Sequence, residues 1–381
     1  MAADTASDEM LIHAAREFAR SELQDRDRRW DRGEGTVVEV LPTLAEMGFF
    51  NIVLPESCGG LGCGYDTYAA IIHEIAYASP SAAVTLCVHN MVGHVLNLFA
   101  PAHLRETLLP HWGEPESFGA FAISEAGAGS DPSASRTRAD RHGDSFVLNG
   151  EKMWITNGLT GRWFVTLART SPGTGKNGLS MILVDGNAAG VGRDPIHGKM
   201  GIRGSETAVI SFSDVKAPCD NLLGEEGEGL AVGLTALNGG RIGIAAQATG
   251  IAAACLDEMI KFAHEREQFG TQLSSFQAIQ QMIADSAVEV AAARELIGYA
   301  ADLIDRGQLD PAASSKAKLF ATEAANRIAY RAVQLHGGMG YVNECRVEQL
   351  YRDVRVTTIY EGTSEIQRLI IARALLKDGV H

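Results

Sequence analysis

Cysteine is sparse in this chain of 381 residues, and its six copies are scattered. No two of them form a C-x-x-C pair, and no H-E-x-x-H or clustered Cys/His spacing occurs. The sequence therefore predicts neither a disulfide framework nor a metal site. Unpaired cysteines in a chain of this length are typical of reduced thiols in the cytosol, so we expect a cytoplasmic protein.

Positive charge is also in short supply, with 33 Lys and Arg against 47 Asp and Glu and a formal net charge of −14. This balance argues against a nucleic-acid or anionic-membrane surface, although one local cationic site for an anionic ligand remains open. The first ten residues are polar and acidic, unlike a signal or transit peptide. No apolar run approaches the ~18 residues of a membrane span, so we predict no membrane segment.

Several familiar signatures are absent as well. No G-x-x-x-x-G-K-[ST] and no G-x-S-x-G occurs. Gly127-Ala128-Gly129 lacks the third glycine of the dinucleotide fingerprint, and Pro132 follows where a helix should open. These absences leave no support for a P-loop, a nucleophile elbow or a Rossmann site.

The sequence pattern changes along the chain. Helical apolar stripes dominate residues 8–117, β-prone runs follow, and a long alanine-rich helical region begins after the glycine-rich stretch 224–229. We predict an α+β multidomain protein with an N-terminal helical domain, an antiparallel, β-barrel-like middle domain and a C-terminal helical bundle. The predicted boundaries are 1–117, 118–228 and 229–381.

The clearest local turn signal is Asn149-Gly150, which lies between the β-prone runs 146–148 and 153–156. This pattern predicts a β-hairpin with a two-residue turn. Further strands are expected at 163–167, 181–184 and 208–212.

A carboxylate, a glycine and two hydroxyls occur together in Tyr360-Glu361-Gly362-Thr363-Ser364, just before an apolar helical pattern. Ser364 and Gln367 have capping-box spacing, which places Glu361 just outside a helix N-terminus. Gly362 lacks a Cβ, so another molecule could approach the backbone there. Taken alone, such a glutamate is more commonly a solvated charge favoured by the helix dipole.

Four further stretches each have a functional and a structural reading. The glycine-rich segment 121–131 could present backbone N–H groups to a pyrophosphate, or could be a flexible turn. Trp154 and Thr156 would point the same way from a strand and could meet a flat heterocycle, or the indole could be half-buried and pack on the core. Arg266 suits a phosphate at a helix end, and the segment 334–341 is a second close-approach loop in which His336 has no partner by spacing.

Five motifs occur in a fixed order: S-E-A-G-A-G-S-D from Ser124, K-M-W-I-T-N-G from Lys152, R-E-Q-F-G from Arg266, Q-L-H-G-G-M-G-Y from Gln334 and Y-E-G-T-S-E-I-Q-R from Tyr360. With the helical–β–helical order they resemble the acyl-CoA dehydrogenase family over essentially the whole chain. Each motif alone is weak, but five in this order are highly specific. The segment 240–245 and the Ser364-Glu365 pair are most similar to short-chain and short-branched members.

The resemblance implies a homotetramer, a dimer of dimers, with one FAD per subunit and electron-transferring flavoprotein as acceptor. The positions implied to hold the flavin are Phe121, Ala122, Ile123, Ser124, Gly129, Ser130, Trp154, Ile155 and Thr156. Those implied to bind the ADP half of a neighbouring subunit's FAD are Arg266, Gln268, Phe269, Gln277, Gln334, Gly337 and Gly338. Thr363 and Glu365 would complete the cofactor site. The acyl-CoA ligand would meet Ser130, Asn238, Arg241, Tyr360 and Gly362.

The reaction implied is α,β-dehydrogenation of an acyl-CoA thioester to the trans-2-enoyl-CoA. Glu361 would remove the α-proton while the β-hydrogen leaves as hydride to flavin N5. The Glu361 backbone N–H and a flavin ribityl hydroxyl could stabilise the carbonyl oxygen, and an apolar site would raise the pKa of Glu361. Some family members carry their base immediately before the arginine matched by Arg241; here that residue is Gly240, which leaves Glu361 as the only candidate.

Two departures from the family pattern are visible. Ala126 replaces a usual proline, and Asn238 replaces a usual aspartate on the CoA side of the ligand, which leaves an acyl-carrier-protein thioester open as substrate. The same fold could also serve an acyl-CoA oxidase, a desulfinase or a nitroalkane oxidase, although the last uses aspartate as base. A catalytically inactive flavoprotein or helical scaffold is the remaining alternative, and the presence of all five motifs disfavours it.

Overall fold

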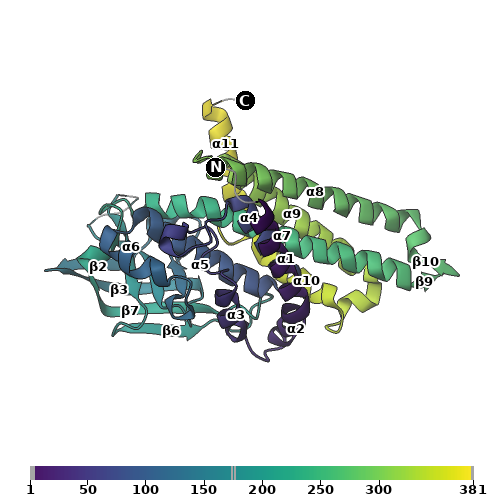
Figure 1. Cartoon of the computed structure of the whole chain (residues 1–381), viewed down its shortest axis with the longest axis horizontal. Helices are drawn as coiled ribbons and strands as arrows, with labels where there is room; N and C mark the ends of the chain where they lie inside the picture. Colours follow the sequence, from purple (N-terminus) through teal and green to yellow (C-terminus); the bar gives the residue numbers. More distant parts are fainter. Residues whose placement is uncertain (1–4, 173–174, 176, 379–381) are drawn as a thin grey trace.

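The computed structural model describes residues 5–172, 175 and 177–378. The first four residues of the acidic N-terminus, and the outermost residues of the two predicted terminal domains, lie outside this part of the chain. Figure 1 shows a sheet-containing region at one side and a bundle of long helices at the other, with the N-terminal helices packed across both. The order of elements is helical, β and helical, as the sequence predicted.

The N-terminal region consists of helices joined by short turns. They are α1 (Thr5–Phe18), α2 (Gln24–Asp31), α3 (Leu41–Glu46), α4 (Tyr65–Ala78), α5 (Pro80–Phe99) and α6 (Ala102–Leu108). Helix α5 begins sharply because Ser79 accepts a hydrogen bond from Ala82 N and Pro80 supplies the fixed φ of a first helical position.

Helix α5 corrects one expectation from the sequence. Over Pro80–Phe99 it is long and apolar enough, by length and composition, to cross a membrane. The prediction that no apolar run approaches the length of a membrane span is therefore wrong. Its most apolar window is 78% buried inside the protein, as in the central helix of a soluble core. The helix packs against α4, α7 and β1, so its apolar character serves internal packing.

The middle region is a sheet whose strands run in the order β6-β7-β3-β2-β4-β5-β8, with β1 paired to β4. The strands are β1 (Gly119–Ala122), β2 (Arg138–His142), β3 (Ser145–Thr156), β4 (Trp163–Arg169), β5 (Leu179–Asp185), β6 (Val191–Pro195), β7 (Thr207–Pro218) and β8 (Leu222–Leu223). Most pairs are antiparallel, but β1 and β4 run parallel. The three strands expected from the sequence at 163–167, 181–184 and 208–212 lie within β4, β5 and β7.

The hairpin predicted at Asn149-Gly150 is wrong. Both residues lie inside the continuous strand β3, at a register shift against β7, and the real turn between β2 and β3 is at residues 143–144. Gly150 has φ +145° and Asn149 exchanges two hydrogen bonds with Asp214 on β7. A β-bulge requires the same permissive glycine as a tight turn, so the dipeptide alone does not distinguish them.

The C-terminal region is built on long helices. They are α7 (Gly229–Glu265), α8 (Gln277–Asp305), α9 (Pro311–His336), α10 (Arg346–Val354) and α11 (Ser364–Asp378), with the small strand pair β9 (Glu267–Gln268) and β10 (Thr271–Gln272) between α7 and α8. Helix α7 contacts α4, α5, α8 and α9 and is the central element of the molecule. In Figure 1 the β9–β10 turn lies at the end of the bundle farthest from the sheet, and α11 projects from the body.

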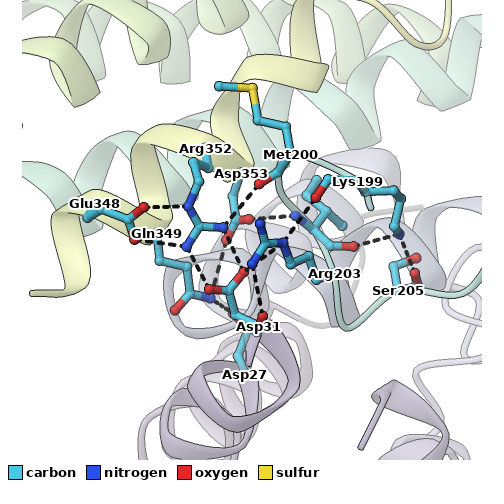
Figure 2. A network of polar contacts seen from close by, with 11 residues as sticks. Asp27, Asp31, Lys199, Met200, Arg203, Ser205, Glu348, Gln349, Arg352 and Asp353 are labelled. Carbon is cyan, nitrogen blue, oxygen red and sulfur yellow. Dashed lines mark hydrogen bonds and ion pairs between the residues drawn. The ribbon is translucent and has the colours of Figure 1, made fainter. Parts of the chain in front are cut away.

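A polar network joins the three regions (Figure 2). Asp27 on α2 and Asp353 on α10 are both buried, and the Gln349 side-chain amide donates to each of them. The backbone N–H of Ile202, in the loop before β7, also donates to Asp353. Burial raises the pKa of both carboxyl groups. The charged neighbours of the pair are Asp31, Lys199, Arg346 and Arg352.

Candidate active site

Glu361 lies in a turn with an unusual backbone, immediately before α11. Its φ is +54°, and Gly362 follows at +91°, so two consecutive residues occupy the left-handed region. A non-glycine residue there costs of order 1–3 kcal/mol unless its surroundings fix it. The position outside a helix N-terminus agrees with the sequence, but the cap does not. Thr363 Oγ1, not Ser364, accepts the hydrogen bond from Ile366 N at 3.4 Å.

Two side chains fix the carbonyl groups of this turn. Lys318 Nζ, from α9, donates to the Gly362 carbonyl oxygen at 2.8 Å. Gln367 Nε2 donates to the same oxygen at 2.8 Å and to that of Glu361 at 3.1 Å. Gln367 therefore bonds backward to the turn, and the capping-box role expected for it with Ser364 is wrong.

The Glu361 carboxyl group lies against the backbone of α7. A Cβ added to Gly240 would be only 2.6 Å from Glu361 Oε2 and 2.9 Å from Met91 Sδ, so a glycine is required for the carboxyl group to lie there. Oε2 is buried and has no hydrogen-bond partner among the described residues. Burial raises the pKa of Glu361 to about 7, although Arg241 and Lys318 counteract part of the effect.

Arg241 of α7 is a charged neighbour of this carboxyl group. Arg241 is buried, and its guanidinium donates to Asn238 Oδ1 at 2.9 Å. Arg241 Nε, like Glu361 Oε2, finds no partner within the described part of the chain. Buried polar atoms without partners are rare in folded proteins and are expected where a ligand completes the site.

Glycines of α7 also allow aromatic side chains of α4 to approach the site. A Cβ at Gly239 would meet the Tyr65 hydroxyl, and one at Gly243 would meet the Tyr68 hydroxyl, each at 2.5 Å. Burial and the nearby Glu361 charge raise the pKa of the Tyr68 hydroxyl, so it stays neutral and can only exchange hydrogen bonds. The Glu361 carboxyl group thus lies near Met91 and the neutral Tyr68 hydroxyl, and its cationic neighbours are Arg241 and Lys318.

The two segments expected to hold the flavin are brought together. Met153 N donates to Ser124 O at 2.9 Å. The buried Lys152 pairs with Glu125 at 2.7 Å and donates to Ile123 O at 3.0 Å. These contacts position residues 121–124 beside the end of β3.

Trp154 is the most distinctive side chain of this surface. It lies at the second register shift of β3 with φ +65°, and its side chain remains 58% exposed. This exposed fraction is compatible with both readings from the sequence, an indole that meets a flat heterocycle and a half-buried indole that packs on the core. The exposed indole directly follows Met153, whose backbone contacts Ser124, and it offers an aromatic face to a flat ring system.

The residues expected at the ADP half lie elsewhere in the chain. Arg266 caps the end of α7, Gln268 ends β9, and Phe269, in the β9–β10 turn, is 95% exposed. His336 stacks on Phe262 at 4.3 Å, which places the end of α9 beside the end of α7. Gln277, Gln334, Gly337 and Gly338 are also exposed. Figure 1 shows that this end of the bundle is remote from β3, so one chain does not bring the two groups together.

The remaining residues that the resemblance assigns to the site differ in their burial. Tyr360 is half-buried, and its hydroxyl donates to Gln247. Thr363 is half-buried, whereas Glu365 and Ser130 are exposed. Lys318 and Gln367 were not assigned a role in the site from the sequence, because no short motif connects Lys318 with the turn that it contacts.

Three family models match successive parts of the chain. The N-terminal domain model of acyl-CoA dehydrogenases matches residues 5–114, the middle-domain model 120–215 and the C-terminal-domain model 227–376. Together with the site, these matches define the class of protein: a three-domain flavoprotein oxidoreductase.

Individual relatives resemble this chain over nearly its whole length. The chain is 40% identical over 371 residues to the mitochondrial short-chain specific acyl-CoA dehydrogenase of Mus musculus, covering 97% of this chain and 90% of the relative. It is also 40% identical over 371 residues to the caffeyl-CoA reductase–Etf complex subunit CarC of Acetobacterium woodii, with 97% and 98% coverage. Butyryl-CoA dehydrogenase of Megasphaera elsdenii superposes with a TM-score of 0.94 at 33% identity, covering 97% and 98%. The chain belongs to the acyl-CoA dehydrogenase family and is an FAD-dependent enzyme.

Proposed function

We propose that the protein removes the α-proton and the β-hydrogen of an acyl-CoA thioester and forms the trans-2-enoyl-CoA. The observation that carries this proposal is the Glu361 carboxyl group, with one buried oxygen that has no partner in the described chain. Its pKa of about 7 makes it a matched base at neutral pH. Because the reaction needs the carboxylate, the rate should rise with pH through about 7 and level off above.

Three neighbours of Glu361 cannot take the proton in its place. Gly240 has no side chain, and the Tyr68 hydroxyl stays protonated because burial raises its pKa. Arg241 is a permanent cation. Glu361 is therefore the group that takes the α-proton, and its own backbone N–H is the proposed donor to the thioester oxygen.

FAD fits the surface made by residues 121–130 and the end of β3. Ser124, Thr156 and Trp154 would bind and orient its ring system, and bound FAD supplies the acceptor for the β-hydrogen. Arg266, Gln268 and Phe269 would bind the ADP half of a cofactor held mainly by a neighbouring subunit. This division of the cofactor site between two copies requires at least a dimer, and the homotetramer, a dimer of dimers, is proposed from the resemblance to the family.

The acceptor and the compartment follow as parts of the same proposal. A relative is named as a subunit of a reductase–Etf complex, which supports electron-transferring flavoprotein as the physiological acceptor. All six cysteines are free thiols, which is consistent with a cytoplasmic enzyme. Asn238 bonds to Arg241 and could accommodate either a CoA or an acyl-carrier-protein thioester.

The reverse reaction is a second candidate, favoured by one observation. A carboxyl group with a pKa of about 7 is present in both protonation states near neutral pH, so Glu361 could return a proton to the α-carbon of an enoyl thioester. The reductase name of the relative from A. woodii makes this direction worth measuring.

The experiment that tests the proposal is an anaerobic screen of the holoenzyme. The bound flavin should lose its absorbance with one or more members of an acyl-CoA panel, and the prereduced enzyme should be reoxidised by the matching 2-enoyl-CoA. Rapid reoxidation by O₂ would instead support an acyl-CoA oxidase. If no acyl-CoA and no acyl-carrier-protein thioester reduced the flavin, thioester dehydrogenation would be excluded.

A further inference from the structure

Lys318 is a buried lysine whose position the proposed reaction does not explain. It lies on α9 and its side chain is fully buried. Among the described residues its Nζ has a single acceptor, the Gly362 carbonyl oxygen at 2.8 Å. An ammonium group has three N–H donors, so most of its hydrogen-bonding capacity is unused in this environment.

Two other lysines, the buried Lys152 and the half-buried Lys199, show how different this arrangement is. Lys152 forms an ion pair with Glu125 and two further hydrogen bonds. Lys199 donates to the Ile202 and Ser205 carbonyl oxygens and to the Thr207 hydroxyl. Burying an ammonium with only one neutral acceptor is costly, and Lys318 therefore needs a nearby negative charge to remain protonated.

That charge is Glu361, the residue whose turn Lys318 contacts. Burial lowers the pKa of Lys318 to about 8, and the charge of Glu361 raises it in part. The same attraction acts in the other direction on Glu361. The other groups that face the carboxyl group are Tyr68 on α4, Cys87 on α5, Arg241 on α7 and Tyr360 beside it in the chain; those that face Lys318 are Arg241, Glu323 and Glu365.

We propose that Lys318 is a positioning residue for the base: from α9 it fixes the left-handed Glu361–Gly362 turn through the Gly362 carbonyl, and its charge favours the carboxylate form. It touches neither the reacting atoms nor the flavin surface and acts only through Glu361. Gln367 shares the first role, since it donates to the same carbonyl, but it is neutral and cannot perform the second. The inference rests on the proposed function for the identity of the base.

The two roles can be separated by substitution. Lys318→Met removes both the charge and the hydrogen bond, Lys318→Gln removes the charge and keeps a donor, and Gln367→Leu removes two hydrogen bonds without changing charge. Lys318 is one of the two cations that lower the pKa of Glu361, because a nearby positive charge favours the carboxylate form. We therefore expect the pH midpoint of flavin reduction to rise in both Lys318 variants and to stay unchanged in Gln367→Leu. The plateau rate should fall about tenfold or more in Lys318→Met and Gln367→Leu, with KM nearly unchanged.

Lys199→Met is the matched control. It also removes a lysine that donates to backbone carbonyls, although Lys199 is half-buried and lies at the junction between regions, not beside Glu361. It should lower thermal stability and leave the pH midpoint where the wild type has it. An equal shift in Lys199→Met would show that any buried-lysine defect changes the profile, and would overturn the assignment.

A second readout does not depend on turnover. In holoenzyme carrying [5-¹³C]glutamate, the Glu361 resonance is the one missing from Glu361→Gln, and its titration gives the carboxyl pKa directly. The pKa should be higher in Lys318→Met and Lys318→Gln than in the wild type. If both variants titrate like the wild type, the proposal is wrong. This test is informative even if no thioester reduces the flavin, so its failure is distinct from failure of the proposed function.

Discussion

Gly240→Ala is a sharp test of the geometry around Glu361. The added Cβ would lie 2.6 Å from Oε2, and an ordinary contact begins at 3.4 Å, so the carboxyl group must move by about 0.8 Å. A misplacement near 1 Å in a reacting group can cost about 10²-fold. Both contacted groups, the Glu361 carboxyl and Met91 Sδ, end flexible side chains, so the fold itself should tolerate the change. The helical preference of Ala over Gly, roughly 0.5–1 kcal/mol, offsets part of the strain.

The assay is anaerobic stopped-flow reduction of the bound flavin, with thermal unfolding measured alongside. We expect Gly240→Ala to bind FAD normally and to reduce it on the order of 10²-fold more slowly. Gly298→Ala is the matched control, because it lies inside helix α8 and no described atom lies within 4 Å of its added Cβ. Its rate should equal that of the wild type. A rate in Gly240→Ala within threefold of the wild type would refute the placement of the carboxyl group against α7.

Two further outcomes are expected. Arg266→Ala should reduce both flavin content and oligomer size on gel filtration, since this guanidinium is proposed to bind a neighbouring subunit's cofactor; unchanged values for both would contradict that placement. Asp353→Asn concerns stability: burial raises the pKa of Asp27 and Asp353, so the folded state binds more protons than the unfolded state above pH ~4 and loses stability as the pH rises through the folded pKa values. The Asn variant should therefore be more stable than the wild type at pH 8, by on the order of 1–3 kcal/mol, and the difference should shrink at pH 5. An identical pH dependence in urea unfolding of both proteins would exclude this account.

Much of the fold could be predicted from the sequence, because the signals lie either within a few neighbouring residues or in the order of several motifs along the chain. The five motifs in order predicted the family, and the residues before α11 correctly placed Glu361 outside a helix N-terminus. Local signals failed where two structures require the same residue types. A bulge and a turn both accept Asn149-Gly150, and Thr363 and Ser364 are equally suited to cap a helix.

The support of the base was not predictable because it depends on tertiary packing. Lys318 reaches Gly362 from 44 residues away in sequence, and in an alanine-rich helix a lysine is usually a solvated charge. Only the packing of α9 against the final turn shows that this lysine is buried. The residues proposed to bind the ADP half of FAD differ from Lys318, because the cofactor that they would contact is held mainly by a second copy of the chain.

The central claim is that Glu361 is the base, and Glu361→Gln tests it most directly. The substitution keeps the shape of the side chain and removes its basicity, while Trp154, Thr156 and the Gly362 backbone remain. The measurement is anaerobic stopped-flow reduction of bound FAD by the best thioester from the screen. General-base groups contribute about 10²–10⁴-fold, and no other group near the α-carbon can substitute, so we predict a loss at or beyond the upper end with FAD still bound. Reduction within tenfold of the wild-type rate would show that another group takes the proton.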